Sequence, residues 1–309
     1  MRLFLSSIVF LSIILMSCST VKDANTELTN EKKNRAVEQA QLGTKFFSDS
    51  DYAKALDFFF ISLKINVSID YEQGMISSYN SIGKTYFASG NIDSARTYFN
   101  KAKTIADFLQ DSELIAQSMN NLGELMLAEQ NYETAMGMFS DALILIENEG
   151  KIPLNAVILH NIGIIYKRNG DFIQAELNVN KALSINKKHN LFKEMASNNY
   201  TLSSIYSKQK IYNTALEYIQ EALNIDKKVE NSTGIAKDLF AHGLIYQYMN
   251  SYQEAYIYFQ KSVLIYETLN MSNEVIKTLY KLKETANKLL LYDEADIWKK
   301  TIENLEEIK

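Results

Sequence analysis

The chain has 309 residues, of which 47% are hydrophobic and 22% are charged, so it can bury a core and lacks the profile of a disordered protein. One proline and 11 glycines leave few helix breaks, which favours an all-α architecture over a turn-rich β-fold. The formal charge of -5, with both signs interspersed, argues against a nucleic-acid partner.

Residues 1–17 predict an export signal. Arg2 gives a positive start, residues 3–16 are apolar, and Ser17 is the small residue before Cys18, the only cysteine. An apolar run of about 14 residues is shorter than the roughly 20 that span a bilayer, which favours a cleaved segment over a permanent transmembrane helix. An ordinary signal peptide, with an incidental buried thiol at Cys18, is the alternative.

The sequence Leu-Met-Ser-Cys at 15–18 resembles the lipobox of bacterial lipoproteins, whose peptidase cuts before a cysteine that carries lipid. The resemblance implies that Cys18 becomes an acylated N-terminus, bearing palmitate among several chains, and that it anchors the chain to a membrane of the bacterial cell envelope. No second cysteine exists to form a disulfide, which agrees with this role. Ser19 favours the outer membrane if the organism is Gram-negative.

Residues 18–34 are polar, charged and without apolar periodicity, which predicts a flexible tether. A coil of this length reaches on the order of 20 Å. We expect the folded domain to occupy 35–309.

A 40-residue repeat runs through this domain. One position of the repeat, which we call the rung, recurs every 40 residues. It is occupied by Gly43, Gly83, Gly123, Gly163 and Gly243, and by Ser203 and Lys283 in the two other repeats. An alanine follows every rung after twelve residues: Ala55, Ala95, Ala135, Ala175, Ala215, Ala255 and Ala295. Aromatic or aliphatic residues stand three, nine and sixteen residues after most rungs, a spacing that predicts two amphipathic helices per repeat. Turn residues such as Gly90-Asn91 and Gly170-Asp171 separate the two helices.

The small, tyrosine, alanine and phenylalanine positions resemble the tetratricopeptide signature over residues 36 to about 305. The resemblance implies an all-α, right-handed superhelical α-solenoid of antiparallel helix pairs, built here from seven hairpins that bury their faces against each other. The usual unit has 34 residues. Six more residues lengthen each hairpin by about 1.7 turns. Lys283, Ala286 and Lys299 replace signature residues in the seventh unit, which predicts a degenerate cap.

No pattern predicts an enzyme, a cofactor or a metal site. His160, His189 and His242 do not stand at metal-ligand or catalytic spacing, and His242 is expected in the core. Phosphate-binding loops and hydrolase or metalloprotease motifs are missing from the sequence.

The tetratricopeptide resemblance implies that one stripe of the first helices lines a concave groove. The predicted protein- or peptide-binding residues share this stripe and offer amides, aromatic rings and charges. They are Asn80, Lys84, Asn120, Asn121, Glu124, His160, Asn161, Lys167, Arg168, Tyr200, Lys208, Phe240 and Tyr248. For each polar residue the alternative is that it only solvates the face.

These features lead to two functional hypotheses. The first is a membrane-anchored scaffold or adaptor that binds a protein or peptide in the groove. The second is a peptide-sensing signalling component of the bacterial envelope, since similar long repeats occur in peptide-sensing bacterial regulators. A third class, an enzyme or carbohydrate-binding lipoprotein, has no motif to support it.

Overall fold

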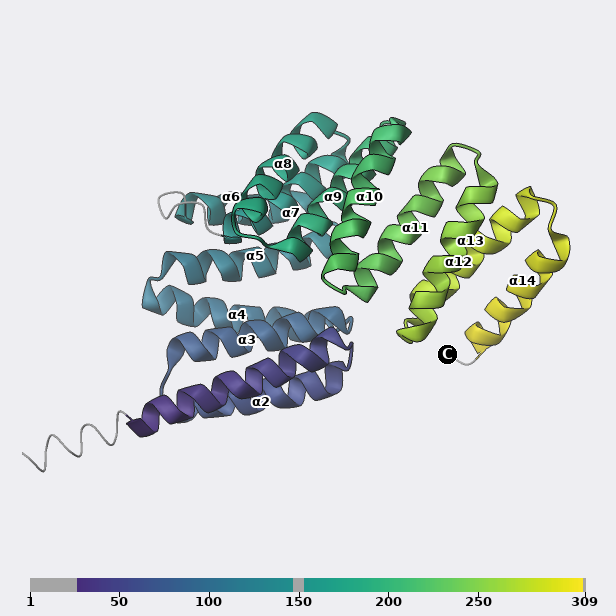
Figure 1. Cartoon of the computed structure of the whole chain (residues 1–309). Helices are drawn as coiled ribbons and strands as arrows, with labels where there is room; N and C mark the ends of the chain where they lie inside the picture. Colours follow the sequence, from purple (N-terminus) through teal and green to yellow (C-terminus); the bar gives the residue numbers. More distant parts are fainter. Residues whose placement is uncertain (1–26, 147–152, 308–309) are drawn as a thin grey trace, which may run out of the picture. The chain divides into compact units, whose positions relative to one another are not determined.

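The computed structural model describes residues 27–146 and 153–307 (Figure 1). Within these ranges the chain forms 14 helices and no strand, which confirms the predicted all-α repeat fold. The chain divides into two compact units, residues 1–148 and 149–309, which we call the N-terminal unit and the C-terminal unit. In both units each helix packs mainly against the helices before and after it in sequence.

The N-terminal unit contains a first described helix at 27–48, followed by α2 (Tyr52–Ser68), α3 (Glu72–Ala88), α4 (Ile92–Leu109), α5 (Ser112–Ala128) and α6 (Tyr132–Ile146). The C-terminal unit contains α7 (Pro153–Asn169), α8 (Phe172–Lys188), α9 (Phe192–Lys208), α10 (Tyr212–Lys228), α11 (Ser232–Tyr248), α12 (Tyr252–Thr268), α13 (Ser272–Lys288) and α14 (Tyr292–Glu307). Within a hairpin, the helix with the rung residue comes first.

The turn between α3 and α4 illustrates how one helix ends and the next begins. Gly90 has a φ of 84°, a left-handed conformation that glycine adopts without steric cost. The Asn91 N–H then donates to the Tyr86 carbonyl at 2.8 Å, which closes the end of α3. The Asn91 side chain accepts from the Ser94 N–H at 3.0 Å and so caps the start of α4. Asn91 therefore stabilises both helices.

Rung residues make room for the side chain sixteen residues later. An added Cβ on Gly83 would lie 2.5 Å from the Phe99 ring, and Gly243 has the same relation to Phe259. Both rings are almost fully buried. Where Ser203 takes the place of glycine, its Oγ donates to the Ala215 carbonyl at 2.8 Å, so the hydroxyl is satisfied. The small residue thus allows the two helices of a hairpin to pack around a large side chain.

The first described helix begins inside the segment expected to be a tether. Residues 27–34 are helical, and the Lys33 Nζ lies 4.0 Å from the centre of the Tyr71 ring at the start of α3. The segment contains no glycine or proline, and extending an existing helix costs little compared with starting one. The lipobox cysteine and the rest of the expected tether lie outside the described residues.

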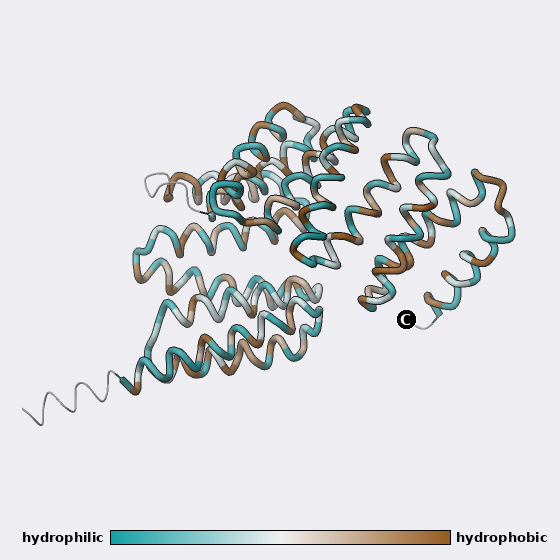
Figure 2. The backbone as a smooth tube through the Cα atoms, viewed as in Figure 1, coloured by the Kyte–Doolittle hydropathy of each residue, from teal (hydrophilic) through white to brown (hydrophobic). Residues whose placement is uncertain are grey.

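The hydropathy pattern agrees with helices that pack on some faces and meet water on others. Figure 2 shows hydrophobic and hydrophilic residues interleaved along the helices. Among the described residues, no helix has the length and apolar character needed to cross a membrane.

Candidate functional site

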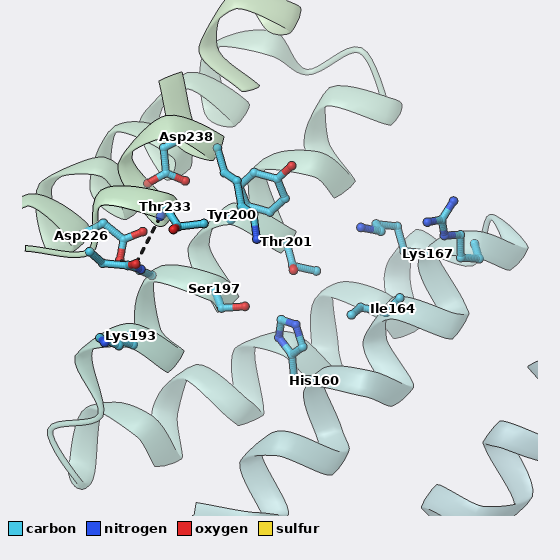
Figure 3. Close-up of a pocket in the computed structure, with 15 residues that line it drawn as sticks. His160, Ile164, Lys167, Lys193, Ser197, Tyr200, Thr201, Asp226, Thr233 and Asp238 are labelled. Carbon is cyan, nitrogen blue, oxygen red and sulfur yellow. Dashed lines mark hydrogen bonds between the residues drawn. The ribbon is translucent and has the colours of Figure 1, made fainter. Parts of the chain in front are cut away.

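A cavity of about 470 Å³ lies on α7, α9 and α11 of the C-terminal unit, where the end of α10 completes its wall (Figure 3). All three main contributors are first helices of their hairpins. The lining residues are His160, Ile164, Lys167, Arg168, Lys193, Ala196, Ser197, Tyr200, Thr201, Asp226, Asn231, Thr233, Gly234, Lys237 and Asp238. The cavity therefore lies on the stripe from which a binding groove was predicted.

A chain of hydrogen bonds holds His160 in the cavity wall. The Asn186 Nδ2 donates to the Asn198 Oδ1 at 2.7 Å, and the Asn198 Nδ2 lies 2.7 Å from the His160 Nδ1. Because an amide nitrogen only donates, the His160 Nδ1 accepts and its Nε2 carries the hydrogen. Burial, followed by the charge of Lys167, lowers the pKa of His160 to about 4. His160 is therefore neutral near pH 7.

Lys167 and Arg168, in the last turn of α7, form a positive region that we call the basic end of the cavity. The Lys167 Nζ donates to the Ser204 Oγ at 3.4 Å. Burial lowers the pKa of Lys167 to about 8, and the charges of Arg168 and Lys208 act in the same direction. Positive charge is therefore concentrated here at a cost, which an anionic group would relieve.

Asp226 at the end of α10 and Asp238 in α11 also line the cavity, and we call them the acid pair. Their exposed fractions are 4% and 2%. The Asn231 Nδ2 donates to the Asp226 Oδ1 at 3.0 Å. The Asp238 Oδ2 is buried and has no hydrogen-bond partner among the described residues. Two carboxyl groups thus lie in a poorly hydrated place, and one oxygen of Asp238 lacks a hydrogen bond there.

The protonation of the acid pair reflects this environment. Burial raises the pKa of both carboxyl groups, and the neighbouring charge of Asp226 helps to bring the pKa of Asp238 to about 8. Lys237 opposes both shifts. Gly234 is required beside the pair, since an added Cβ there would collide with the Asp226 carboxylate. Near pH 7 Asp238 is mostly protonated, and a nearby positive charge would favour its ionised form.

The two charged regions lie apart. Figure 3 shows Asp226 and Asp238 at one end of the cavity and Lys167 at the other, with Tyr200 and His160 between them. Tyr200 also borders a second cavity of about 180 Å³ between α9 and α11. That cavity includes Lys208, Leu244 and Tyr248. The arrangement offers opposite charges at the two ends and apolar and hydroxyl-bearing surface alongside.

Six of the predicted groove residues meet at these cavities. His160, Lys167, Arg168 and Tyr200 line the larger one, and Lys208 and Tyr248 line the smaller one.

Two further predicted groove residues of the C-terminal unit line neither cavity. Asn161 is 7% exposed within α7. Phe240 is 6% exposed and contacts the Phe259 ring at 5.4 Å between centroids, so it belongs to the core. The physical reason is that a large ring gains more by packing between helices than by facing water. His242, predicted in the core, is 2% exposed, and its Nδ1 lies 3.2 Å from the Asp238 carbonyl.

The predicted groove residues of the N-terminal unit are largely engaged with one another. Asn80, Asn120 and Asn121 are 5%, 3% and 1% exposed. The Asn121 Nδ2 donates to the Asn80 Oδ1 at 2.9 Å and so links α5 to α3. The Asn120 Nδ2 donates to the Glu124 Oε1 at 2.9 Å, while Lys84 is exposed. These buried amides hold successive first helices together, because a buried polar group is stable only when paired.

Sequence reasoning missed the acid pair, although the repeat contained a signal. Asp226 stands 23 residues after its rung, where Asn66 and Asn186 stand in other units, and Asp238 stands where Ser78 and Asn198 stand. An acid that replaces neutral polar residues at two buried repeat positions is unusual enough to mark a site.

A metal centre has no support in the part of the chain that the structure describes. No group of three or more His, Cys, Asp or Glu side chains there is placed to hold a metal ion. The acid pair alone provides only two carboxylates.

Consecutive helical hairpins that pack in sequence order define a helical-repeat protein. A tetratricopeptide repeat model matches residues 74–148 and 114–188, and a second tetratricopeptide repeat model matches 196–229 and 239–269. Together these matches cover more than half of the chain, which therefore belongs to the tetratricopeptide repeat family. No curated protein matches the chain.

Solved structures with similar folds include sensory proteins. A Rap protein in complex with competence and sporulation factor has a TM-score of 0.67 and 18% identity, over 87% of this chain and 74% of that one. The apo quorum sensor NprR of B. thuringiensis has a TM-score of 0.66 and 17% identity, over 92% and 80%. BtubC of P. vanneervenii has a TM-score of 0.60 and 18% identity, over 70% and 90%. At these identities the likeness establishes the fold.

Proposed function

We propose that this tetratricopeptide repeat protein binds a segment of another protein, or a short peptide, in the cavity on α7, α9 and α11. The observation that supports this most is the cavity itself: about 470 Å³, within the usual range of ligand sites, with basic residues at one end and acidic residues at the other. The charges of Lys167 and Asp238 do not stabilise the folded chain, because the pKa of each group is shifted in the direction that favours its neutral form. A bound segment with matching charges recovers that cost.

We further propose that the chain works as a scaffold or adaptor held at a bacterial envelope membrane by lipid on Cys18. This part of the proposal rests on the lipobox-like sequence at 15–18 and on the polar segment that follows it. Several acyl chains on one residue provide the stable anchoring that a single chain does not.

The second candidate is a peptide sensor of the envelope. Its support is the modest size of the cavity, which suits a short segment better than a folded partner, together with the printed descriptions of two structural neighbours. One neighbour is complexed with competence and sporulation factor, and another is a quorum sensor. A sensor and a scaffold differ in whether the occupant is a free peptide or part of a larger protein.

A capture experiment separates the two candidates. The full-length chain, solubilised in detergent and immobilised, is incubated in parallel with envelope proteins and with a library of random short peptides. A stoichiometric protein partner supports the scaffold, and retained peptides without such a partner support the sensor. If neither is retained, the binding proposal is wrong.

Charge reversal at the basic end tests whether capture occurs in the cavity. Lys167→Glu with Arg168→Glu is expected to weaken capture by at least about tenfold, since like charges would replace matched ones. Lys187→Glu with Lys188→Glu is the matched control, because these lysines occupy the last turn of the second helix α8 and are exposed. Both pairs lose the same interaction with a helix C-terminus. Equal loss in the two variants would place the binding elsewhere.

The anchor is tested by metabolic labelling with palmitate in a bacterial host. Cys18→Ala is expected to abolish incorporation, whereas Ser19→Ala, one residue away, is expected to retain it. Label in the Cys18 variant would remove the lipid anchor from the proposal without affecting the cavity.

A further inference from the structure

The acid pair differs from the side chains at the same positions in neighbouring repeats. At the boundary between the first and second hairpins, where α2 meets α3, the Asn66 Nδ2 donates to the Ser78 Oγ at 3.1 Å. Between α8 and α9 the Asn186 Nδ2 donates to the Asn198 Oδ1 at 2.7 Å. At the next boundary these positions hold Asp226 and Asp238, and no hydrogen bond joins their side chains in the described chain. The side-chain hydrogen bond found at those two boundaries is therefore missing from this one.

Nothing in the C-terminal unit replaces that hydrogen bond. The Asp238 Oδ2 lacks a partner within the described chain although the residue is 2% exposed. The lysines nearby, Lys193 and Lys237, are exposed, and over the described residues neither forms an ion pair with the acid pair within 4.0 Å. Figure 3 shows Asp238 and Asp226 on the same side of the cavity. Both residues line the cavity, so a donor on a cavity ligand would lie next to this incompletely hydrogen-bonded pair.

A donor for this place must carry several N–H groups and positive charge. When both groups are ionised the pair accepts hydrogen bonds only, and a cation favours that form because it compensates the repulsion between the two acids. An ammonium group supplies three donors and a guanidinium supplies five in a planar fork. A neutral amide or hydroxyl donor would leave the charge of the second carboxylate uncompensated.

We propose that Asp226 and Asp238 are the receptor for a positively charged group of the bound peptide or protein segment, either its amino terminus or a lysine or arginine side chain. This inference rests on the proposed function, since it names what the cavity selects in its occupant. The basic end lies at the other end of the cavity. The two charged regions therefore fix the chain direction in which the segment binds.

Cation binding has a protonation consequence at neutral pH. The groups that face Asp238 are Asp226 of α10, Tyr200 of α9, Tyr266 of α12 and Lys237 of its own helix. A bound cation lowers the pKa of Asp238 from about 8, so binding releases up to about one proton near pH 7. Calorimetry in two buffers with different ionisation enthalpies measures that release.

The receptor is tested with Asp226→Asn and Asp238→Asn together. This variant recreates the side-chain pair that Asn186 and Asn198 form one repeat earlier, so the fold is expected to persist. The control is Glu217→Gln with Glu221→Gln, two exposed residues on α10 whose loss changes the net charge equally. Three libraries of short peptides are offered: free amino terminus without lysine or arginine, acetylated with lysine or arginine, and acetylated without either.

Full-length wild-type protein is expected to retain at least one of the two cationic libraries and to bind the acetylated neutral library at least about 30-fold more weakly. The Asp226 and Asp238 variant is expected to lose that preference, and the control variant to keep it. Which cationic library is retained distinguishes an amino terminus from a side chain. Equal retention of the neutral library, or an unchanged preference in the double variant, overturns the receptor while leaving peptide binding intact.

If wild type retains no library, the proposed function fails, and the receptor is decided by small probes. Carbon-13 labelling of aspartate carboxyl groups follows Asp238 directly during titration with n-butylammonium or methylguanidinium. A saturable shift of its carboxyl signal, missing from Asp238→Asn, supports the receptor. A signal that does not respond to either cation overturns it.

Discussion

Two successive repeat boundaries of the C-terminal unit show what one change of chemistry does to a buried position. At the α8–α9 boundary, Asn186 and Asn198 pair and then hold His160, and the neutral Asn186 Oδ1 is buried without a hydrogen-bond partner among the described residues. At the next boundary Asp226 and Asp238 leave a carboxylate oxygen unpartnered. The backbone scaffold is the same, so the side chains decide whether the boundary is a closed structural contact or an open charged site.

The strongest test of this comparison introduces two aspartates at the α8–α9 boundary in place of Asn186 and Asn198. Asn186→Asp with Asn198→Asp is expected to lower the free energy of unfolding by about 3–5 kcal/mol at neutral pH, because two buried charges appear and the donor to His160 is lost. Chemical denaturation measures the loss. Asn100→Asp with Asn224→Asp, at exposed helical positions, is the control and should change stability little. A similar small change in both variants would show that buried charge is not what separates the two boundaries.

The pH dependence of stability should separate wild type from Asp238→Asn. Because the folded pKa is about 8 and the usual value is 3.8, the folded chain keeps a proton that the unfolded chain releases between these values. The free energy of unfolding therefore falls as pH rises through that window, by up to about 6 kcal/mol in total, and levels off above pH 8. Asp238→Asn should lack this slope. Parallel curves for both proteins across pH 4 to 8 would contradict the raised pKa of Asp238.

A substitution beside the acid pair gives a smaller effect. Gly234→Ala is expected to lower the free energy of unfolding by about 1–3 kcal/mol, since its Cβ would displace the buried Asp226 carboxylate. Gly137→Ala in α6 is the matched control: its Cβ meets nothing within 4 Å, so alanine should stabilise that helix by about 0.5–1 kcal/mol. Opposite signs in the two thermal melts support the packing argument, and two gains in stability would refute it.

The smallest expected effect comes from shortening the amide pair. Asn198→Ser should preserve a contact with Asn186 like that of Asn66 with Ser78, but it removes the donor to His160. A loss of about 1 kcal/mol follows from one missing hydrogen bond. Asn224→Ser, at an exposed position of α10, provides the comparison. If both variants lose the same amount, the bond to His160 contributes nothing measurable.

The periodicity of the sequence predicted the fold class, whereas the stripe of first helices that borders the cavity was implied by the tetratricopeptide resemblance. His160 and Lys167 share one face of α7 at any tertiary arrangement, and Tyr200 holds the position of His160 in the next repeat. The structure brings all three to one cavity. Phe240 belongs to the same stripe and yet is buried, since side-chain size and the neighbouring Phe259 determine its exposure. Position on a helix thus predicts direction but not burial.

The repeat interval by itself determined that helices pair and stack, since no hairpin buries its apolar face alone. Tertiary structure decided which polar side chains have partners. Asn80 and Asn121 are 41 residues apart and satisfy each other across α3 and α5, whereas Asp226 and Asp238, 12 residues apart, leave an oxygen unpaired. The physical reason is that a hydrogen bond depends on a few tenths of an ångström and on a donor being present, neither of which sequence spacing specifies.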